Sequence, residues 1–232
     1  MGLFGLFKKT PDFEHSSNDP YNDKATNLIY NLLFCDNLGL FKYNTTQPWL
    51  YPFDILFSDK FIMADLQRII DDSNSDPRLK LLAYNKQMAN GYKSTKKELL
   101  GVIVEIGLDK GLDVLASYNN GSARYINQTG KMIIWETTND KMANDLTMDL
   151  FLKSQNVVKQ IGPWDKPRKT YPKKGIARIT FLVSDGLYFG EAPTKILFND
   201  PLAGQALLAA KNLMNYLTEK TLETKVKNSD QR

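Results

Sequence analysis

The chain has 232 residues, of which 42% are hydrophobic and 24% are charged, and its formal net charge is +4. This composition excludes a largely disordered protein, and no apolar run is long enough for a transmembrane helix. One cysteine and one histidine exclude an internal disulfide and a zinc site of nitrogen and sulfur ligands, and they argue against a Ser-His-Asp or Cys-His catalytic site. We therefore expect a cytoplasmic protein with no metal and no cofactor.

Residues 1–23 precede the first periodic segment and are expected to form a flexible N-terminal segment. They contain four apolar residues followed by two lysines: Leu3, Phe4, Leu6, Phe7, Lys8 and Lys9. A secretory signal has the opposite order, with the charge first, so we expect no export. The apolar residues followed by cations suggest contact with a membrane surface or a partner's groove. Packing against the chain's own domain is the alternative interpretation.

Three helices are predicted next, over residues 24–36, 59–72 and 77–90, from apolar residues at helical spacing. Asp23 is the expected N-cap of the first helix, and Pro77 suits the first turn of the third. Cys35 falls at the far end of the first helix among apolar neighbours. This position predicts a buried and unreactive thiol.

An aromatic-rich connector over residues 43–57 separates the first two predicted helices, and we call it the aromatic connector. Pro48 and Pro52 exclude a regular helix there and predict an extended segment. Trp49, Tyr51 and Phe53 are candidate partner-binding residues, since aromatic side chains often anchor protein interfaces. A segment that covers the edge of a core is the alternative.

From residue 99 the apolar pattern changes to alternation, which predicts strands over 99–107, 112–118, 122–127 and 131–136. The separators are short, and Asn119-Asn-Gly121 is a strong hairpin signal. Such short connections join antiparallel neighbours, so the sequence predicts a four-stranded meander. The later elements follow in this order: a helix over 140–161, strands over 176–184 and 187–191, and a helix over 201–221.

The element order predicts an α+β fold with N-terminal helices, an antiparallel meander of four strands plus a later hairpin, and helices packed on one face. No polar linker interrupts it, so we expect one domain over residues 24–221 and a flexible C-terminal tail over 222–232. The order is broadly similar to that of profilin-, longin- and roadblock-type modules. No motif is shared, so the similarity implies nothing about function.

Charged residues on the predicted strands form one candidate catalytic group. Glu105, Asp113 and Arg124 are expected as cross-strand partners, with Glu136 nearby. Two carboxylates beside an arginine suit acid–base chemistry on an anionic or sugar-like substrate. The alternative is a solvated sheet face with weak ion pairs, each contributing about 0.2–1 kcal/mol.

Residues 162–175 form a loop with five cations, two aromatic residues and three prolines, which we call the basic loop. Its candidate binding residues are Trp164, Lys166, Arg168, Lys173 and Lys174. Cations beside aromatic rings suit anionic partners, including nucleic acid, but no recognised nucleic-acid-binding motif accompanies them. A connection pinned to the core by its tryptophan is the alternative.

These observations favour a non-catalytic cytoplasmic interaction or ligand-binding module. We expect it to contact a protein or a membrane-associated partner through the aromatic connector and the basic loop. An enzyme that uses the carboxylate and arginine residues is the first alternative. A non-specific nucleic-acid binder is the second, and the least favoured.

Overall fold

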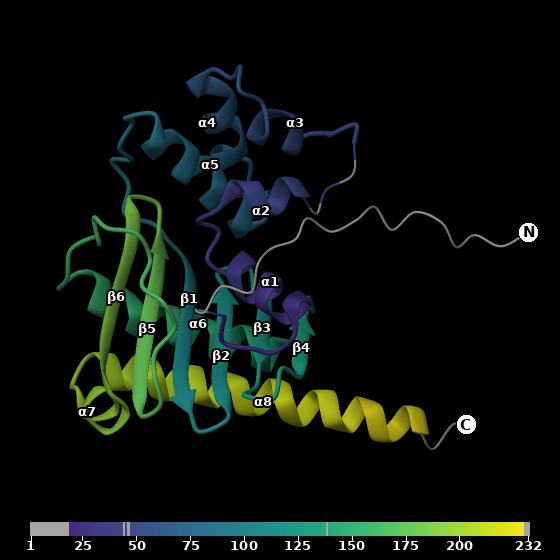
Figure 1. Ribbon diagram of the computed structural model, residues 1–232, viewed down its shortest axis with the longest axis vertical. Coiled ribbons are helices and arrows are strands. Elements are labelled where there is room, and N and C mark those ends of the chain that lie inside the picture. Colours follow the sequence, from purple (N-terminus) through teal and green to yellow (C-terminus); the bar gives the residue numbers. More distant parts are fainter. Residues whose placement is uncertain (1–18, 44, 46, 138, 230–232) are drawn as a thin grey trace, which may run out of the picture.

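The structure is a computed structural model that describes residues 19–43, 45, 47–137 and 139–229. Its centre is a six-stranded antiparallel sheet (Figure 1). The strands are β1 (Leu99–Leu108), β2 (Gly111–Tyr118), β3 (Ala123–Ile126), β4 (Met132–Trp135), β5 (Ile176–Val183) and β6 (Gly186–Pro193). The helices are α1 (Lys24–Leu32), α2 (Leu38–Tyr43), α3 (Phe53–Leu56), α4 (Met63–Asp71), α5 (Pro77–Ala89), α6 (Lys141–Val158), α7 (Thr194–Asn199) and α8 (Ala203–Ser229). The predicted α+β class, with its meander and later hairpin, is confirmed.

The strands lie in the order β4-β3-β2-β1-β5-β6, so the later hairpin joins the meander through β1. On one side β1 pairs with β2, where Gly101 lies opposite Tyr118. On its other side β1 pairs with β5, where Ile103 lies opposite Thr180. The central strand therefore has one neighbour that follows it directly and another that comes only after β2, β3, β4 and α6.

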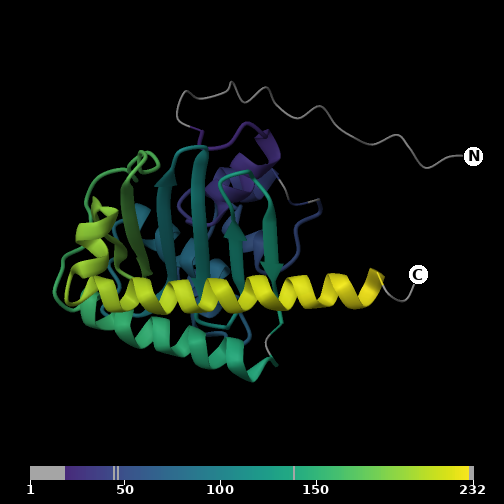
Figure 2. The same ribbon diagram turned by 90° about the horizontal axis from the view of Figure 1, so that it is seen from below.

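Helices cover both faces of the sheet, whereas we expected them on one face. The helix α1 lies over one face of the sheet, and α6 and α8 pack together on the other (Figures 1 and 2). The helices α2 to α5 extend the layer of α1 beyond the end of the sheet at which β1 begins (Figure 1). The reason lies in β1, which is buried along most of its length. Its Ile103 faces the core under the N-terminal helices, while Val102 and Val104 face the core under α6 and α8. A strand that is apolar on both sides needs a layer on each face.

The N-terminal helices differ in extent from those expected. The Asp23 carboxylate caps α1 by accepting a hydrogen bond from the Thr26 amide at 2.7 Å, as predicted, but α1 ends at Leu32. The short helices α2 and α3 were not predicted. A helix can begin in the aromatic connector because Pro52 occupies the N-cap of α3, where a missing amide N–H breaks no helical hydrogen bond.

The two ends of the described chain also differ from the expectation. Tyr21 is buried, and its hydroxyl donates a hydrogen bond to the Leu112 carbonyl at 2.9 Å, so the residues just before α1 pack on the sheet. At the other end, α8 continues to Ser229 and extends past β4 in both views (Figures 1 and 2). The apolar residues 3–7 lie outside the described residues. None of the described helices has the length and apolar character needed to cross a bilayer.

Cys35 is expected to be unreactive in the native protein. Its side chain has no solvent exposure, and burial raises the pKa of the thiol, so little thiolate forms and reagents cannot approach it. We expect alkylation by iodoacetamide, followed by mass spectrometry, to be at least about 100-fold slower than for an exposed cysteine. The Met148→Cys variant supplies that exposed control within the same protein. Rapid modification of native Cys35 would contradict the placement of this residue.

Candidate functional site

Glu105, the first candidate catalytic residue, lies fully buried on the face of β1 that the N-terminal helices cover. The Tyr30 hydroxyl donates a hydrogen bond to Glu105 Oε1 at 2.7 Å, and Arg178 Nη1 donates to Oε2 at 3.5 Å. Burial raises the pKa of Glu105, and Arg178 and the Tyr30 hydrogen bond oppose that rise. Both carboxylate oxygens therefore bind groups of the protein itself.

Asp113 lies on the opposite face of the sheet, because it pairs in register with Ile106, the neighbour of Glu105. Its carboxylate accepts hydrogen bonds from the Tyr125 hydroxyl at 3.2 Å and from the Gln128 amide at 2.6 Å. The structure therefore does not bring Asp113 and Glu105 together.

Arg124 and Glu136 are the two candidates that the structure does bring together. They form an ion pair, and Arg124 also donates hydrogen bonds to the backbone carbonyls of Ala123 and Trp135. The Glu136 side chain is about half exposed. The four candidate residues thus occupy three separate places in the fold.

The basic loop is fixed to the body of the protein at several points. Its Trp164 packs edge-on against Phe189 at 5.0 Å between ring centroids and forms a bridge with the backbone of Leu187. Arg168 pairs with Asp36 at 2.7 Å and lies over the Phe34 ring at 3.9 Å. These contacts use two of its proposed binding residues to hold the loop in place.

The remaining cations of the basic loop differ in their surroundings. Lys174 pairs with Asp109, and the Lys166 ammonium lies 5.6 Å from the centre of the Trp164 ring. Lys173 is exposed. Much of the positive charge of this loop is therefore balanced by the protein's own carboxylates and rings.

The aromatic connector is also largely part of the scaffold. Phe53 stacks on Phe57 at 5.2 Å between ring centroids, and Trp49 meets Phe57 edge-on at 5.1 Å. Tyr51 is exposed and lies under the Arg68 guanidinium at 5.1 Å. Of the three proposed partner-binding aromatics, only Tyr51 is exposed.

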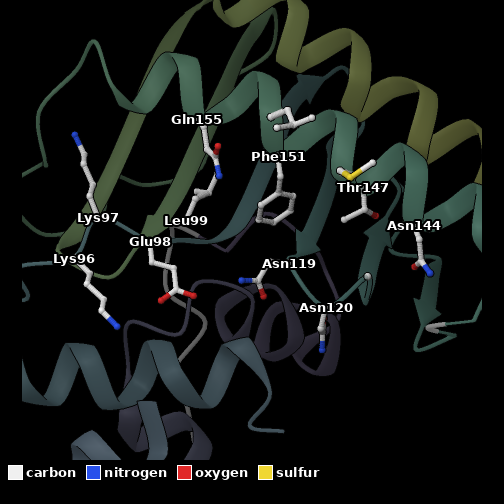
Figure 3. A pocket seen from close by; sticks show the side chains of 13 residues that line it. Lys96, Lys97, Glu98, Leu99, Asn119, Asn120, Asn144, Thr147, Phe151 and Gln155 are labelled. Carbon is white, nitrogen blue, oxygen red and sulfur yellow. The ribbon is translucent and has the colours of Figure 1, made fainter. Parts of the chain in front are cut away.

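A groove lies between α6 and one end of the sheet. Its volume is about 1010 Å³. The sheet contributes the start of β1 with the residues before it, over 96–99, and the β2–β3 turn over 119–121. The other wall is one stripe of α6: Asn144, Thr147, Met148, Phe151, Leu152 and Gln155. We call this cavity the α6 groove (Figure 3).

The spacing of the α6 residues explains the shape of the groove. Positions 144, 147, 148, 151, 152 and 155 recur at intervals of three and four, so they share one side of the helix. At 1.5 Å per residue, this stripe runs for roughly 16 Å along three turns. The groove is therefore elongated, with a helix as one long wall.

The sheet-side wall is held by Ser184 at the end of β5. Its hydroxyl accepts a hydrogen bond from the Glu98 amide at 2.9 Å and donates one to the Lys96 carbonyl at 2.6 Å. The Ser184 amide also donates to the Glu98 carbonyl at 2.9 Å. These bonds fix the segment before β1, which forms this wall of the groove.

Apolar and polar side chains occupy different parts of the groove. Leu99 and Phe151 are buried in its floor, while Met148 and Leu152 of the wall are 59% and 56% exposed. The Thr147 side chain is only 5% exposed, and its hydroxyl has no hydrogen-bond partner in the described structure. This hydroxyl is enclosed by the protein, so it does not face a group placed in the groove.

The two ends of the groove differ in charge (Figure 3). Asn144 and Asn120 lie at one end, with Asn119 between them and the centre. Lys96 and Lys97 lie at the other end, near Glu98 and Gln155. One end of the groove is thus neutral and rich in amides, and the other carries the cations.

The α6 groove is not among the sites predicted from the sequence. Its signal was present in α6, where Met148 and Leu152 are apolar although they fall outside the buried positions of that helix. Met142 of the same helix is exposed as well. Asn119 and Asn120 were explained by the hairpin alone, so no reason remained to assign them a second role.

Comparison of the chain with protein-family models, with curated proteins and with solved structures found no match. In the described residues, no group of three histidine, cysteine, aspartate or glutamate side chains is placed to hold a metal ion.

Proposed function

We propose that this chain is a non-catalytic cytoplasmic module that binds a segment of a partner protein in the α6 groove. The observation that carries the proposal is the exposure of Met148 and Leu152 on a rigid groove wall. When a partner covers large apolar side chains, their burial stabilises the complex by about 25 cal/mol per Å² of apolar surface removed from water. Methionine also adapts its shape to different partners.

The polar groups of the groove suit a polypeptide in particular. A peptide backbone offers alternating N–H donors and C=O acceptors, and amide side chains can bind both. Asn119 and Asn120 both line the groove. The combination of an apolar centre and a polar rim is typical of protein interfaces.

The surfaces favoured from the sequence have a smaller part in this proposal. Exposed Leu50 and Tyr51 of the aromatic connector, and Lys173 of the basic loop, remain available as additional contacts with a protein or a membrane-associated partner. An enzyme is less favoured, because Glu105 and Asp113 lie on different faces of the sheet. A nucleic-acid binder is less favoured, because Arg168 and Lys174 pair with the protein's own carboxylates.

Site-specific photocrosslinking in the native host tests this function. A benzophenone amino acid placed at position 148 or 152 should crosslink to a partner protein on irradiation, because both side chains face the groove. The control is the same amino acid at Ile196 of α7, which is 63% exposed and lies at the other end of the sheet. A partner that is trapped at 148 and 152 but not at 196, and is identified by mass spectrometry, is the expected result.

A competing substitution completes the experiment. Leu152→Glu should abolish the crosslink from position 148, because a carboxylate would then have to be buried against the partner. Crosslinks of equal strength at 148 and 196, or none at 148, would show that the groove is not the binding surface.

A further inference from the structure

We propose that the partner segment held in the α6 groove has an apolar centre and a carboxylate at one end, and that this carboxylate contacts Lys96. The inference rests on the proposed function and adds the chemistry and the direction of the bound segment. It follows from the uneven distribution of charge along the groove and from the length of its apolar part.

The cationic end has one ammonium group that the protein does not use. Lys97 donates a hydrogen bond to the Val158 carbonyl at 2.9 Å and lies over the Tyr188 ring at 4.7 Å, so it serves the end of α6. The Lys96 ammonium has no partner among the described residues. An anionic group of a ligand would therefore meet Lys96 first.

Glu98 is the one acidic residue that lines the groove, and it is engaged elsewhere. Together with burial, its charge and its hydrogen bond raise the pKa of Tyr84 in α5 to about 12. Glu98 therefore interacts with the helix next to the groove. Lys96 and Lys97 outnumber its single negative charge, so the net charge of the lining at this end is positive.

The length of the groove limits the bound segment. The α6 stripe of roughly 16 Å accommodates about five residues of an extended chain, or three turns of a helix. Met148 and Leu152 lie near the middle of that length, so the apolar side chains of the segment belong there.

A carboxylate at the end of such a segment has two possible sources, an acidic side chain or the free C-terminus of the partner. Both provide the same two oxygens and the same charge. The charge of the groove favours a carboxylate in either case, and the experiment distinguishes an acidic side chain from a free C-terminus.

A random peptide library displayed with free C-termini, and a second library displayed as internal segments, should be selected against the full chain. We expect enriched peptides with two or more of Leu, Ile, Met and Phe, and with a carboxylate on one side of them. Enrichment in both libraries indicates an acidic side chain, and enrichment only in the first indicates the C-terminus.

Fluorescence titrations of a selected peptide then test the contact with Lys96. We expect Lys96→Glu to weaken binding about 3- to 10-fold, since an exposed ion pair is replaced by repulsion. A peptide that carries lysine or an amide in place of its carboxylate should recover affinity for this variant. Lys195→Glu, which makes the same charge change on the exposed surface of α7, should leave the affinity unchanged.

The possible outcomes separate the inference from the proposed function. Peptides that lose binding in Leu152→Glu, but show no common carboxylate and bind Lys96→Glu normally, would overturn the inference and leave the function intact. If no peptide depends on Leu152, both are wrong. Preferential binding of a fluorescent fatty acid at the same residues would also overturn the inference. Thermal melts of each variant confirm that the substituted surface residues leave the fold unchanged.

Discussion

Replacing Arg178 with methionine should lower the free energy of unfolding by about 3–5 kcal/mol near neutral pH. Arg178 is almost fully buried in β5, where it contacts Glu105 and forms an ion pair with Glu191. It also donates a hydrogen bond to the Thr170 carbonyl at 2.6 Å, which fixes the basic loop. Methionine fills a similar volume but leaves the fully buried Glu105 carboxylate without a cation. Chemical denaturation measures the loss.

A second substitution separates the buried charge from the lost packing. Adding Glu105→Gln to Arg178→Met should recover about 1–3 kcal/mol, because an amide can keep the hydrogen bond with Tyr30 and carries no charge. If Arg178→Met lowers the free energy of unfolding by less than about 1 kcal/mol, Arg178 and Glu105 do not form the buried ion pair described here.

The pH dependence provides an independent check with a defined sign. Burial raises the folded-state pKa of Glu105 above its unfolded value, so the folded state favours the protonated carboxyl. The stability that the protonated carboxyl contributes is fully present below the unfolded-state pKa of Glu105. It is lost as the pH rises through the folded-state pKa. Removing the Arg178 cation raises the folded pKa further. The destabilisation by Arg178→Met should therefore be larger at about pH 7 than at about pH 5.

The Gly107→Ala variant is the second substitution with a large expected effect. A Cβ on Gly107 would lie under 3.0 Å from the backbone of Lys173 and 2.7 Å from the Pro172 carbonyl oxygen. These atoms belong to the basic loop, which the Gly175 amide also ties to the Gly107 carbonyl at 2.9 Å. Because the obstacle is backbone, the loop must move away from the sheet. We expect Gly107→Ala to lower the free energy of unfolding by roughly 3 kcal/mol, which is at the upper end of the range for overpacked sites.

Gly162→Ala is the matched control, since no atom lies within 4 Å of the Cβ it would introduce in the same loop. Its effect on the melting temperature should be small. The Gly107→Ala variant should also show faster proteolysis within residues 162–175. Equal stability of the two variants would show that the loop does not pack on β1 at this point.

The sheet could be predicted from the sequence because its strands are joined by short turns with strong local signals. The Asn119-Asn-Gly121 turn and the Asp185-Gly186 turn each specify a hairpin without reference to the rest of the chain. The position of β5 beside β1 had no local signal, since it depends on packing between distant segments. The second helical layer was missed for the same reason, although the apolar residues on both sides of β1 required it.

The α6 groove could not be predicted, because it is formed by three segments that are far apart in the sequence. Thr147 appears ordinary until its hydroxyl is seen to be buried and unpaired. Conversely, Glu105 and Arg178 attract attention as charged residues within strands. Their burial and mutual contact, which make them structural, depend on the strand order.

The position of β1 between β2 and β5 has a consequence for synthesis on the ribosome. When the meander and α6 have emerged, one edge of β1 still lacks its partner, and it stays open until residues 176–183 follow. The apolar face that includes Val102 and Val104 also stays partly uncovered until α8, the last helix, packs on it. An unpaired apolar edge invites association between nascent chains. Expression of this chain should therefore depend on holdase chaperones until its final segment is released.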